Sequence, residues 1–134
     1  MNKIYVLTLI IFLLINQQNV FAHIIDDEEQ KCISKTSSTT EMNKCSQIAL
    51  DSWDKEINDI LYYLQNNTDL TTYKKIMQSQ RLWEQYKNNE IKTYSKFLTE
   101  YSQGTMYKNV SKGHEIDIVK QRALQLQEYK NIYQ

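Results

Sequence analysis

Residues 38–64 read STTEMNKCSQIALDSWDKEINDILYYL, and this stretch decides the fold. Its apolar residues recur at steps of three and four, which places them on one face of a helix; they are Met42, Cys45, Ala49, Trp53, Ile57, Ile60, Leu61 and Leu64. Ser38 and Glu41 have the spacing of a capping box, with a hydroxyl at the N-cap and a carboxylate three residues later. The stretch therefore predicts a long amphipathic helix that begins after Ser38 and ends near Gln65.

A second helix is expected directly downstream. Thr68 or Asp69 can cap it, and its apolar face runs on to Tyr101, with Gln80 and Glu90 in the same stripe. A helix of about 30 residues is long for a globular protein, so a break or bend near Asn88-Asn89 is an alternative to one continuous helix.

The helical pattern is lost between Ser102 and Gly113. Both glycines of the chain, Gly104 and Gly113, lie in this segment, so we expect a loop there. A third helix is expected over residues 115–132, with Ala123 and Leu126 on its buried face.

These elements predict an all-α domain over residues 38–134, built as a long helical hairpin with a third helix packed along it. The absence of proline and the many Lys, Gln, Glu and Leu residues favour long helices. Residues 23–37 are expected to form an extended N-terminal segment, and the acidic run Asp26–Glu29 within it is interpreted as a solvated tail. Most of the tyrosines fall on apolar faces, whereas Tyr62, Tyr63 and Tyr107 fit less well and are candidates for an interface.

The first 22 residues have the pattern of a cleavable signal peptide. Lys3 precedes an apolar run from Ile4 to Ile15, which is shorter than the roughly 20 residues that a membrane-spanning helix needs. Small or modest side chains at Val20 and Ala22 predict cleavage after Ala22. The alternative is an uncleaved N-terminal anchor. With cleavage, we expect a periplasmic or secreted protein with no membrane span.

Two cysteines in an exported chain suggest one disulfide, between Cys32 and Cys45. Chain-entropy arithmetic values the closure of such a short loop at about 3 kcal/mol. Free thiols, or pairing with another chain, are the alternatives. The 16 basic and 16 acidic residues balance, which argues against nucleic acid as a partner.

A search for catalytic chemistry finds little. His114-Glu115 lacks the second histidine of a zinc-binding H-E-x-x-H motif, and no nucleophile elbow or phosphate-binding loop is present. We therefore expect no enzyme, metal or cofactor. Arg81 and Arg122 lie beside inward-facing stripes, where a cation usually pairs with a carboxylate or stacks on an aromatic ring. We interpret both as residues that fix how the helices dock.

Several motifs, in order along the chain, resemble the LprI-type lysozyme-inhibitor-like family. These are Cys32 with Glu41-Met42-Asn43 and Cys45, then Asp54 to Asn58, Gln80-Arg81-Leu82-Trp83 with Tyr86 and Glu90, Gly104-Thr105-Met106, and Gln121-Arg122. The resemblance implies a small exported helical bundle with disulfides, and Gln80, Arg81, Trp83, Tyr86 and Arg122 as its structural motif. Some members of the family are proposed to bind and inhibit host lysozyme.

The chain departs from the family pattern at two positions together. Members commonly carry a second cysteine pair, and the matching residues here are Ile91 and His114. The resemblance therefore implies one disulfide where relatives have two, and a segment 102–113 held by packing alone. The Arg and Asp of the family motif that includes Tyr86 are replaced by Lys87 and Asn88, which weakens a buried ion pair there.

The leading functional hypothesis is a protein-binding domain that inhibits a host c-type lysozyme by covering its active-site cleft. A cationic or hydrogen-bonding tip would complement the two cleft carboxylates, and Lys108, Lys112 and His114 in the glycine-bounded loop are the candidate contact residues. The alternatives are an envelope structural or interaction protein of the same fold with another partner, and an enzyme that acts on the cell wall.

Overall fold

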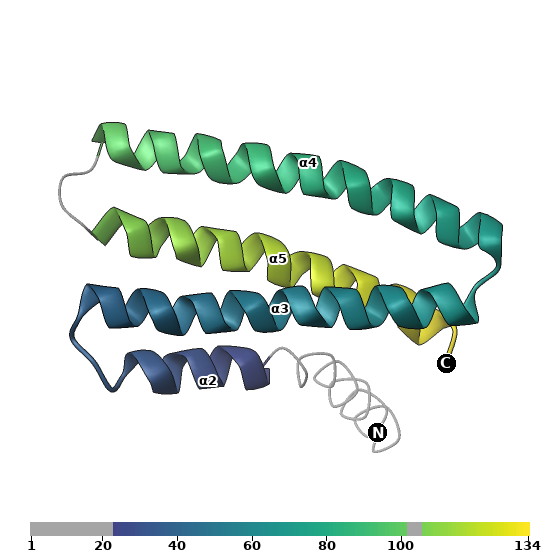
Figure 1. Cartoon of the computed structure of the whole chain (residues 1–134), viewed down its shortest axis with the longest axis horizontal. Coiled ribbons are helices and arrows are strands. Elements are labelled where there is room, and N and C mark those ends of the chain that lie inside the picture. Colours follow the sequence, from purple (N-terminus) through teal and green to yellow (C-terminus); the bar gives the residue numbers. More distant parts are fainter. Residues whose placement is uncertain (1–22, 102–105) are drawn as a thin grey trace, which may run out of the picture.

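The computed structural model describes residues 23–101 and 106–134, which form four helices (Figure 1). They are α2 (His23–Ile33), α3 (Thr39–Asn67), α4 (Leu70–Tyr101) and α5 (Met106–Ile132). The expected all-α class is confirmed, and so is the disulfide between Cys32 and Cys45. The predicted signal peptide lies outside the described residues.

The helices lie side by side in the order α2, α3, α5, α4 (Figure 1). The most extensive interface joins α3 to α5, whereas α3 and α4 barely touch although they are consecutive in the chain. The third predicted helix therefore lies between the two arms of the hairpin. As a consequence, α4 is attached to the rest of the molecule almost entirely through α5.

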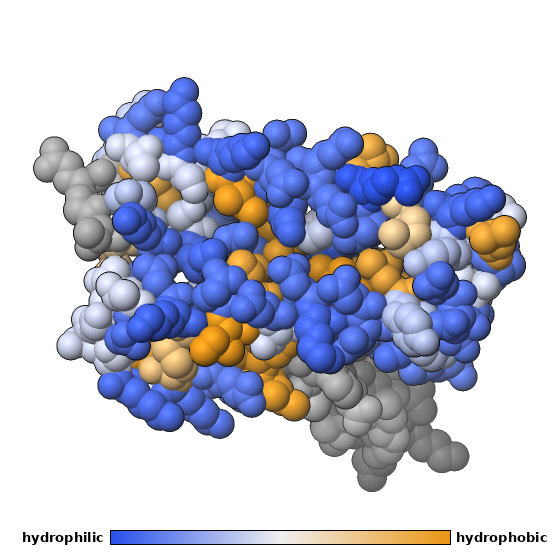
Figure 2. All heavy atoms as spheres, viewed as in Figure 1, coloured by the Kyte–Doolittle hydropathy of each residue, from blue (hydrophilic) through white to orange (hydrophobic). Residues whose placement is uncertain are grey.

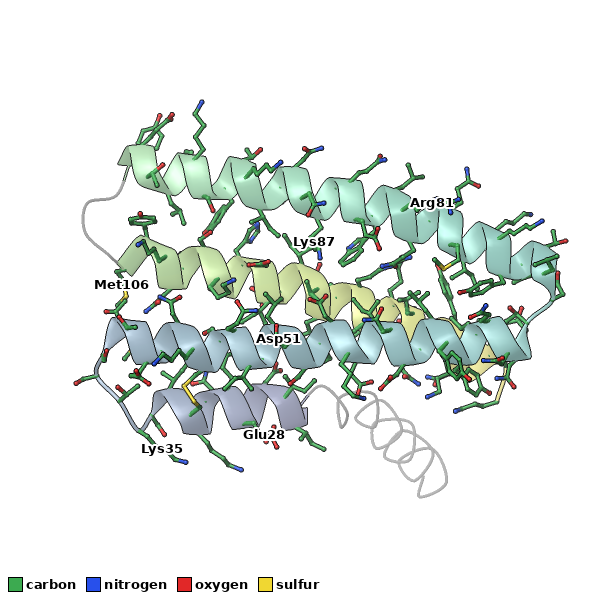
Figure 3. All side chains as sticks on the ribbon, in the orientation of Figure 1. Glu28, Lys35, Asp51, Arg81, Lys87 and Met106 are labelled. Carbon is green, nitrogen blue, oxygen red and sulfur yellow. A yellow bond between two sulfur atoms is a disulfide. The ribbon has the colours of Figure 1, made fainter. Side chains whose placement is uncertain are left out.

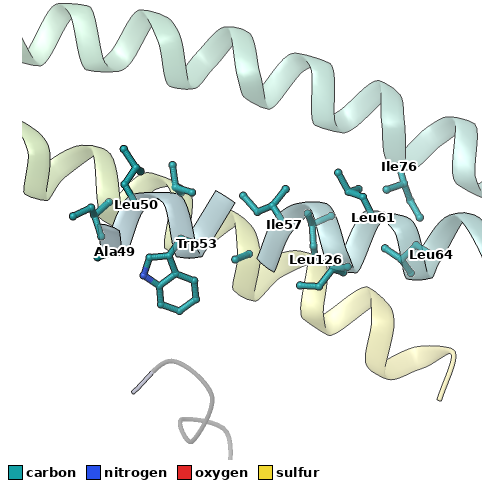
Figure 4. Close-up of a cluster of buried hydrophobic side chains, with 12 residues drawn as sticks. Ala49, Leu50, Trp53, Ile57, Leu61, Leu64, Ile76 and Leu126 are labelled. Atoms are coloured by element: carbon teal, nitrogen blue, oxygen red, sulfur yellow. The ribbon is translucent and has the colours of Figure 1, made fainter. Parts of the chain in front are cut away.

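The hydrophobic core lies along the interface of α3 and α5 (Figure 4). Leu64, Val119 and Leu126 are its most deeply buried side chains. Of the described residues of α4, Ile76 is the one apolar residue that is buried. The remaining members are Ala49, Leu50, Trp53, Ile57, Ile60, Leu61, Ile116 and Ala123. The apolar stripe of residues 38–64 thus forms the core as predicted, while most of the α4 stripe does not.

Local hydrogen bonds cap the first turns of α3 and α4. The Ser38 hydroxyl accepts a 3.5 Å hydrogen bond from the Glu41 amide, while the Glu41 carboxylate pairs with Lys44. One half of the predicted capping box is therefore present. Asp69 is the cap of α4, since its Oδ1 accepts from the amides of Thr71 and Thr72. Hydrogen bonding from the Thr72 side chain, and then from these amides, holds the pKa of Asp69 below its usual range.

The expectation of an extended segment over residues 23–37 is wrong for its first eleven residues, which form α2. An isolated helix of this length is marginal in water, but α2 is held against α3 by the disulfide. The Glu29 carboxylate also accepts a 2.6 Å hydrogen bond from Ser46, and Asp26 pairs with Lys120 of α5. Two of the four acidic residues that were interpreted as a solvated tail thus anchor the helix.

The expected loop over residues 102–113 is also wrong from Met106 onward, because α5 begins there. Residues 102–105, which include Gly104, lie outside the described part of the chain. Gly113 is helical, and a Cβ at this position would meet open space. The apolar pattern fades in the first turns of α5 because this part of the helix meets polar side chains rather than the core. Helix α4 is continuous through Asn88-Asn89, both of which are exposed.

Within the described residues, no helix combines the length and the apolar character that crossing a bilayer requires.

Candidate functional site

The end of the α4–α5 hairpin exposes large apolar side chains from both helices. Phe97 and Tyr101 of α4 are 57% and 74% exposed, with ring centroids 4.7 Å apart. Met106 and Val110 of α5 are 61% and 46% exposed. We call these four residues the hairpin end. Exposed apolar groups gathered at one place are typical of protein interaction sites.

The hairpin end holds four of the twelve large apolar side chains that are exposed among the described residues, and the other eight are spread over all four helices and the C-terminal end. In the view of Figure 2, hydrophobic residues form separate patches within a mostly hydrophilic surface. Met106 lies where the start of α5 approaches the start of α3 (Figure 3). There the Asn109 amide contacts the sulfur atoms of both Met42 and Met106 at 3.9 Å. The first turn of α5 is therefore positioned against α3 while its apolar side chains remain accessible.

Lys108, Lys112 and His114 do not form the loop predicted from the sequence, because all three lie on α5. Lys108 is exposed beside the hairpin end. The Lys112 ammonium donates to Glu115 at 2.8 Å and to Gln47 of α3 at 3.1 Å. Of the three, Lys108 is the exposed one, whereas Lys112 joins α5 to α3.

His114 joins α5 to α4. Its ring stacks on Tyr94 with centroids 4.0 Å apart, and its Nε2 lies 3.3 Å from the Glu90 carboxylate. Ser95 and Ser111 share a 2.6 Å hydrogen bond at the same interface. Ile91 lies one turn before Tyr94 on the same side of α4, so the two positions where the resemblance implies a second cysteine pair both lie near this interface. Polar and aromatic contacts join the helices here.

A polar layer occupies the space between α3, α4 and α5 next to these contacts. It contains Asp54 of α3, Lys87 of α4 and Glu115 of α5, and Figure 3 shows Lys87 between α4 and α5. Burial raises the pKa of Asp54 above its usual range, and the nearby Lys87 charge opposes this shift only in part. The Lys87 ammonium lies 5.1 Å from the centroid of the Trp83 ring. The C-terminal half of α4 is thus attached through polar groups.

A groove of about 440 Å³ lies between α4 and α5 beyond the polar layer. We call it the Arg122 groove. Its lining residues are Trp83, Tyr86, Ile118, Gln121, Arg122, Leu124, Gln125 and Glu128. Arg122 is only 3% exposed, whereas Tyr86 is 55% exposed at the groove wall.

Arg122 is held by neutral groups. Its Nε donates to Gln80 at 2.8 Å, and its terminal nitrogens donate to Gln125 at 2.5 Å and to Ser79 at 3.4 Å. The guanidinium carbon lies 5.8 Å from the centroid of the Trp83 ring. Burial lowers the pKa of Arg122 below its usual range. Of the five predicted motif residues, the structure brings together Gln80, Trp83, Tyr86 and Arg122.

Arg81 does not share this environment. It is exposed on α4, so the expectation that it fixes helix docking is wrong. Gln80, its neighbour, points inward and makes the contact instead. Consecutive helical residues differ by about 100° in direction, and here Gln80 faces α5 while Arg81 faces solvent.

The sequence pattern did not indicate the exposure of Phe97 and Tyr101 or the role of Gln125. The α4 stripe predicts burial, but in the described structure α5 meets this end of α4 through Tyr94 and Ser95 and leaves Phe97 and Tyr101 exposed. Among the described residues, no group of three or more His, Cys, Asp or Glu side chains could hold a metal ion.

The comparison with protein families gives one match, since the family model described as "Lysozyme inhibitor LprI" matches residues 32–126. No curated protein and no solved structure gives a significant match. The family match runs from Cys32 to Leu126, which covers most of the chain and every groove residue except Glu128. This protein therefore belongs to the LprI lysozyme inhibitor family.

Proposed function

We propose that this protein is exported and binds a host c-type lysozyme, with the hairpin end inserted into the sugar-binding cleft of the enzyme. Membership of a lysozyme inhibitor family supports a protein-binding role. We choose this surface as the lysozyme-binding site because four large apolar side chains are exposed at one end of the molecule. They are Phe97, Tyr101, Met106 and Val110.

The chemistry of the hairpin end fits a cleft lined by carboxylates. Aromatic and apolar side chains supply buried contact area at an interface. Lys96 and Lys108 are exposed on the two helices that carry the hairpin end, and Glu100 is the nearby acidic residue, 3.8 Å from Lys96. A cationic tip complements the two carboxylates of a glycosidase active site. Occlusion of the cleft then blocks substrate without any chemical step.

Export is supported by two features of the chain. Residues 1–22 have the composition of a cleavable signal peptide. The disulfide of Cys32 and Cys45 is typical of an oxidising compartment. The place of action that we propose is the periplasm or the extracellular medium, where a host lysozyme is encountered.

The test is a lysozyme assay with protein produced from the full chain and recovered from the periplasm of an expression host. N-terminal sequencing of that material is expected to begin at His23. The rate of clearing of a cell-wall suspension by c-type lysozyme is expected to fall at a micromolar excess of the protein. No slowing at this excess would reject the proposal, and recovery of a different envelope protein in a pulldown would favour the alternative partner.

A further inference from the structure

Arg122 carries a buried charge that makes no direct ion pair, and Glu84 acts on it from a position where its carboxylate accepts a 3.3 Å hydrogen bond from Gln80. None of the six ion pairs in the described part of the chain includes it. Its hydrogen-bond partners, Gln80, Gln125 and Ser79, are all neutral. Removing a guanidinium from water is costly unless a carboxylate compensates, so a buried arginine in a folded protein is usually paired.

The guanidinium also has donors to spare. It carries five N–H groups, and the three hydrogen bonds to Gln80, Gln125 and Ser79 use one each. Arginine stays protonated in proteins even when burial disfavours its charge. Two N–H groups and a full positive charge are therefore left for a ligand. Arg122, which carries them, is the most buried residue of the groove lining.

The walls of the Arg122 groove suit a side chain that is partly apolar. Trp83 and Tyr86 of α4 line one side, and Ile118 and Leu124 of α5 are also part of the lining. The methylene groups of an acidic side chain can pack against such walls while its carboxylate reaches the guanidinium. The groove also contains Glu128, and Glu84 lies close enough to influence Arg122. These two charges disfavour a doubly charged ligand such as phosphate.

We propose that the Arg122 groove binds an aspartate or glutamate side chain of a partner protein, with its carboxylate on Arg122 and its methylene groups between Trp83 and Tyr86. This site goes beyond the proposed lysozyme-binding function, because the groove lies on a different part of α4 and α5 from the hairpin end. The occupant is chosen by charge complementarity. Arg122 forms no direct ion pair among the described residues, and a single carboxylate can accept hydrogen bonds from its two remaining N–H groups.

The test uses two blocked pentapeptides that differ only at the centre, Ac-Ala-Leu-Glu-Leu-Ala-NH2 and the same peptide with glutamine. NMR follows the Trp83 indole N–H and the Arg122 Nε–H of the full chain purified after export. The glutamate peptide is expected to shift both signals and to saturate, with the glutamine peptide about ten- to hundredfold weaker, as for a hydrogen bond to a charged group. A separate titration with inorganic phosphate is expected to shift neither signal.

Gln125→Glu is the sharpest variant, because it places a carboxylate of the same shape next to Arg122. This internal counter-ion is expected to abolish binding of the glutamate peptide. Gln127→Glu adds the same charge two residues along α5, outside the groove lining, and is expected to bind as wild type does. The same spectra report whether both variants are folded. Equal affinity for the two peptides, saturation by phosphate, or undiminished binding to Gln125→Glu would each overturn the proposal.

Discussion

The imidazole ring of His114 on α5 stacks on the phenol ring of Tyr94 on α4, with their centroids 4.0 Å apart. Glu90 approaches the same imidazole through its carboxylate. These contacts lie at the positions, Ile91 and His114, where the resemblance described above implies a second cysteine pair. At this point the α4–α5 hairpin is therefore joined by noncovalent side-chain contacts.

Restoring the second cysteine pair is expected to stabilise the hairpin. In Ile91→Cys/His114→Cys, the two thiols are expected to form a disulfide across the α4–α5 interface. Closure of a loop of this size is worth about 3 kcal/mol in the chain-entropy model, less any strain. Urea unfolding under oxidising and reducing conditions measures the gain. Ile91→Ser/His114→Ser is the control that loses the native side chains without a bond, and an oxidised cysteine variant no more stable than this control would contradict the prediction.

The native disulfide is expected to hold α2 more than it holds the core. Cys32→Ser/Cys45→Ser removes the covalent link between α2 and α3, while the hydrogen bond of Ser46 to Glu29 remains. The free energy of unfolding is expected to fall by about 3 kcal/mol. Hydrogen exchange is expected to accelerate first in α2, because an isolated helix of eleven residues is marginal. Uniform acceleration across α3 and α5 would show that the bond stabilises the core directly.

The core helices could be predicted from the sequence because their apolar residues keep a strict helical period and pack against each other. The stripe from Cys45 to Leu64 is buried as its spacing indicates. The period of α4 is as clear, yet Phe97 and Tyr101 are exposed. A helical period states which side chains share a face, but it does not state whether a neighbour covers that face.

The candidate site was harder to predict because it depends on contacts between helices. Lys112 and Lys108 are both lysines near a glycine in the sequence, but only Lys112 meets Gln47 and Glu115. Likewise, α2 was missed because its stability comes from partners on other helices, Ser46 and Lys120. Such contacts are between residues far apart in the chain, and local propensity carries no information about them.

Gln80→Leu is expected to weaken the docking of α4 on α5. Gln80 is 3% exposed, and its side-chain oxygen accepts the hydrogen bond from Arg122 Nε. Leucine would leave that buried donor unpaired, at a cost of about 1–3 kcal/mol. Urea unfolding measures the loss. The control is Gln78→Leu, at an exposed site two residues earlier on α4. A Gln80→Leu variant as stable as Gln78→Leu would show that the hydrogen bond contributes nothing.

Asp54→Asn is expected to stabilise the protein at neutral pH. Burial raises the pKa of Asp54, so the ionised carboxylate is less favourable in the folded than in the unfolded state. The penalty is complete above the folded-state pKa and disappears as the pH falls through the folded-state and then the unfolded-state value. Because the site is partly solvated, the gain at pH 7 is at most about 1 kcal/mol. Thermal unfolding from pH 7 to pH 3 should show the two stabilities converging.

The matched control is Asp117→Asn, at an exposed site on α5. It removes the same charge without relieving burial, and it is expected to change the stability little at either pH. A gain from Asp54→Asn that persists at pH 3 would mean that packing of the amide, rather than ionisation of the carboxylate, is responsible.

Inhibition of lysozyme is expected to depend on the aromatic pair of the hairpin end. Phe97→Ser/Tyr101→Ser removes two exposed rings that contribute little to the core, so the fold should be retained. Truncation of central aromatic contacts commonly costs about 2 kcal/mol or more in binding, which corresponds to a loss of at least about thirtyfold in inhibition. Tyr62→Ser is the control, because Tyr62 is 70% exposed on α3, outside the hairpin end.

The charge of the hairpin end provides an independent test of the same interface. Lys108→Glu reverses an exposed charge next to the apolar cluster, whereas Lys74→Glu makes the same change near the opposite end of α4. If the tip faces the cleft carboxylates, Lys108→Glu should weaken inhibition about tenfold or more, because like charges at an interface are strongly disfavoured. Lys74→Glu alters the net charge equally and should leave inhibition close to that of the wild type. Equal losses from the two substitutions would indicate long-range attraction to a basic lysozyme rather than a contact at the tip, and the inhibitory surface would then have to lie elsewhere on the molecule.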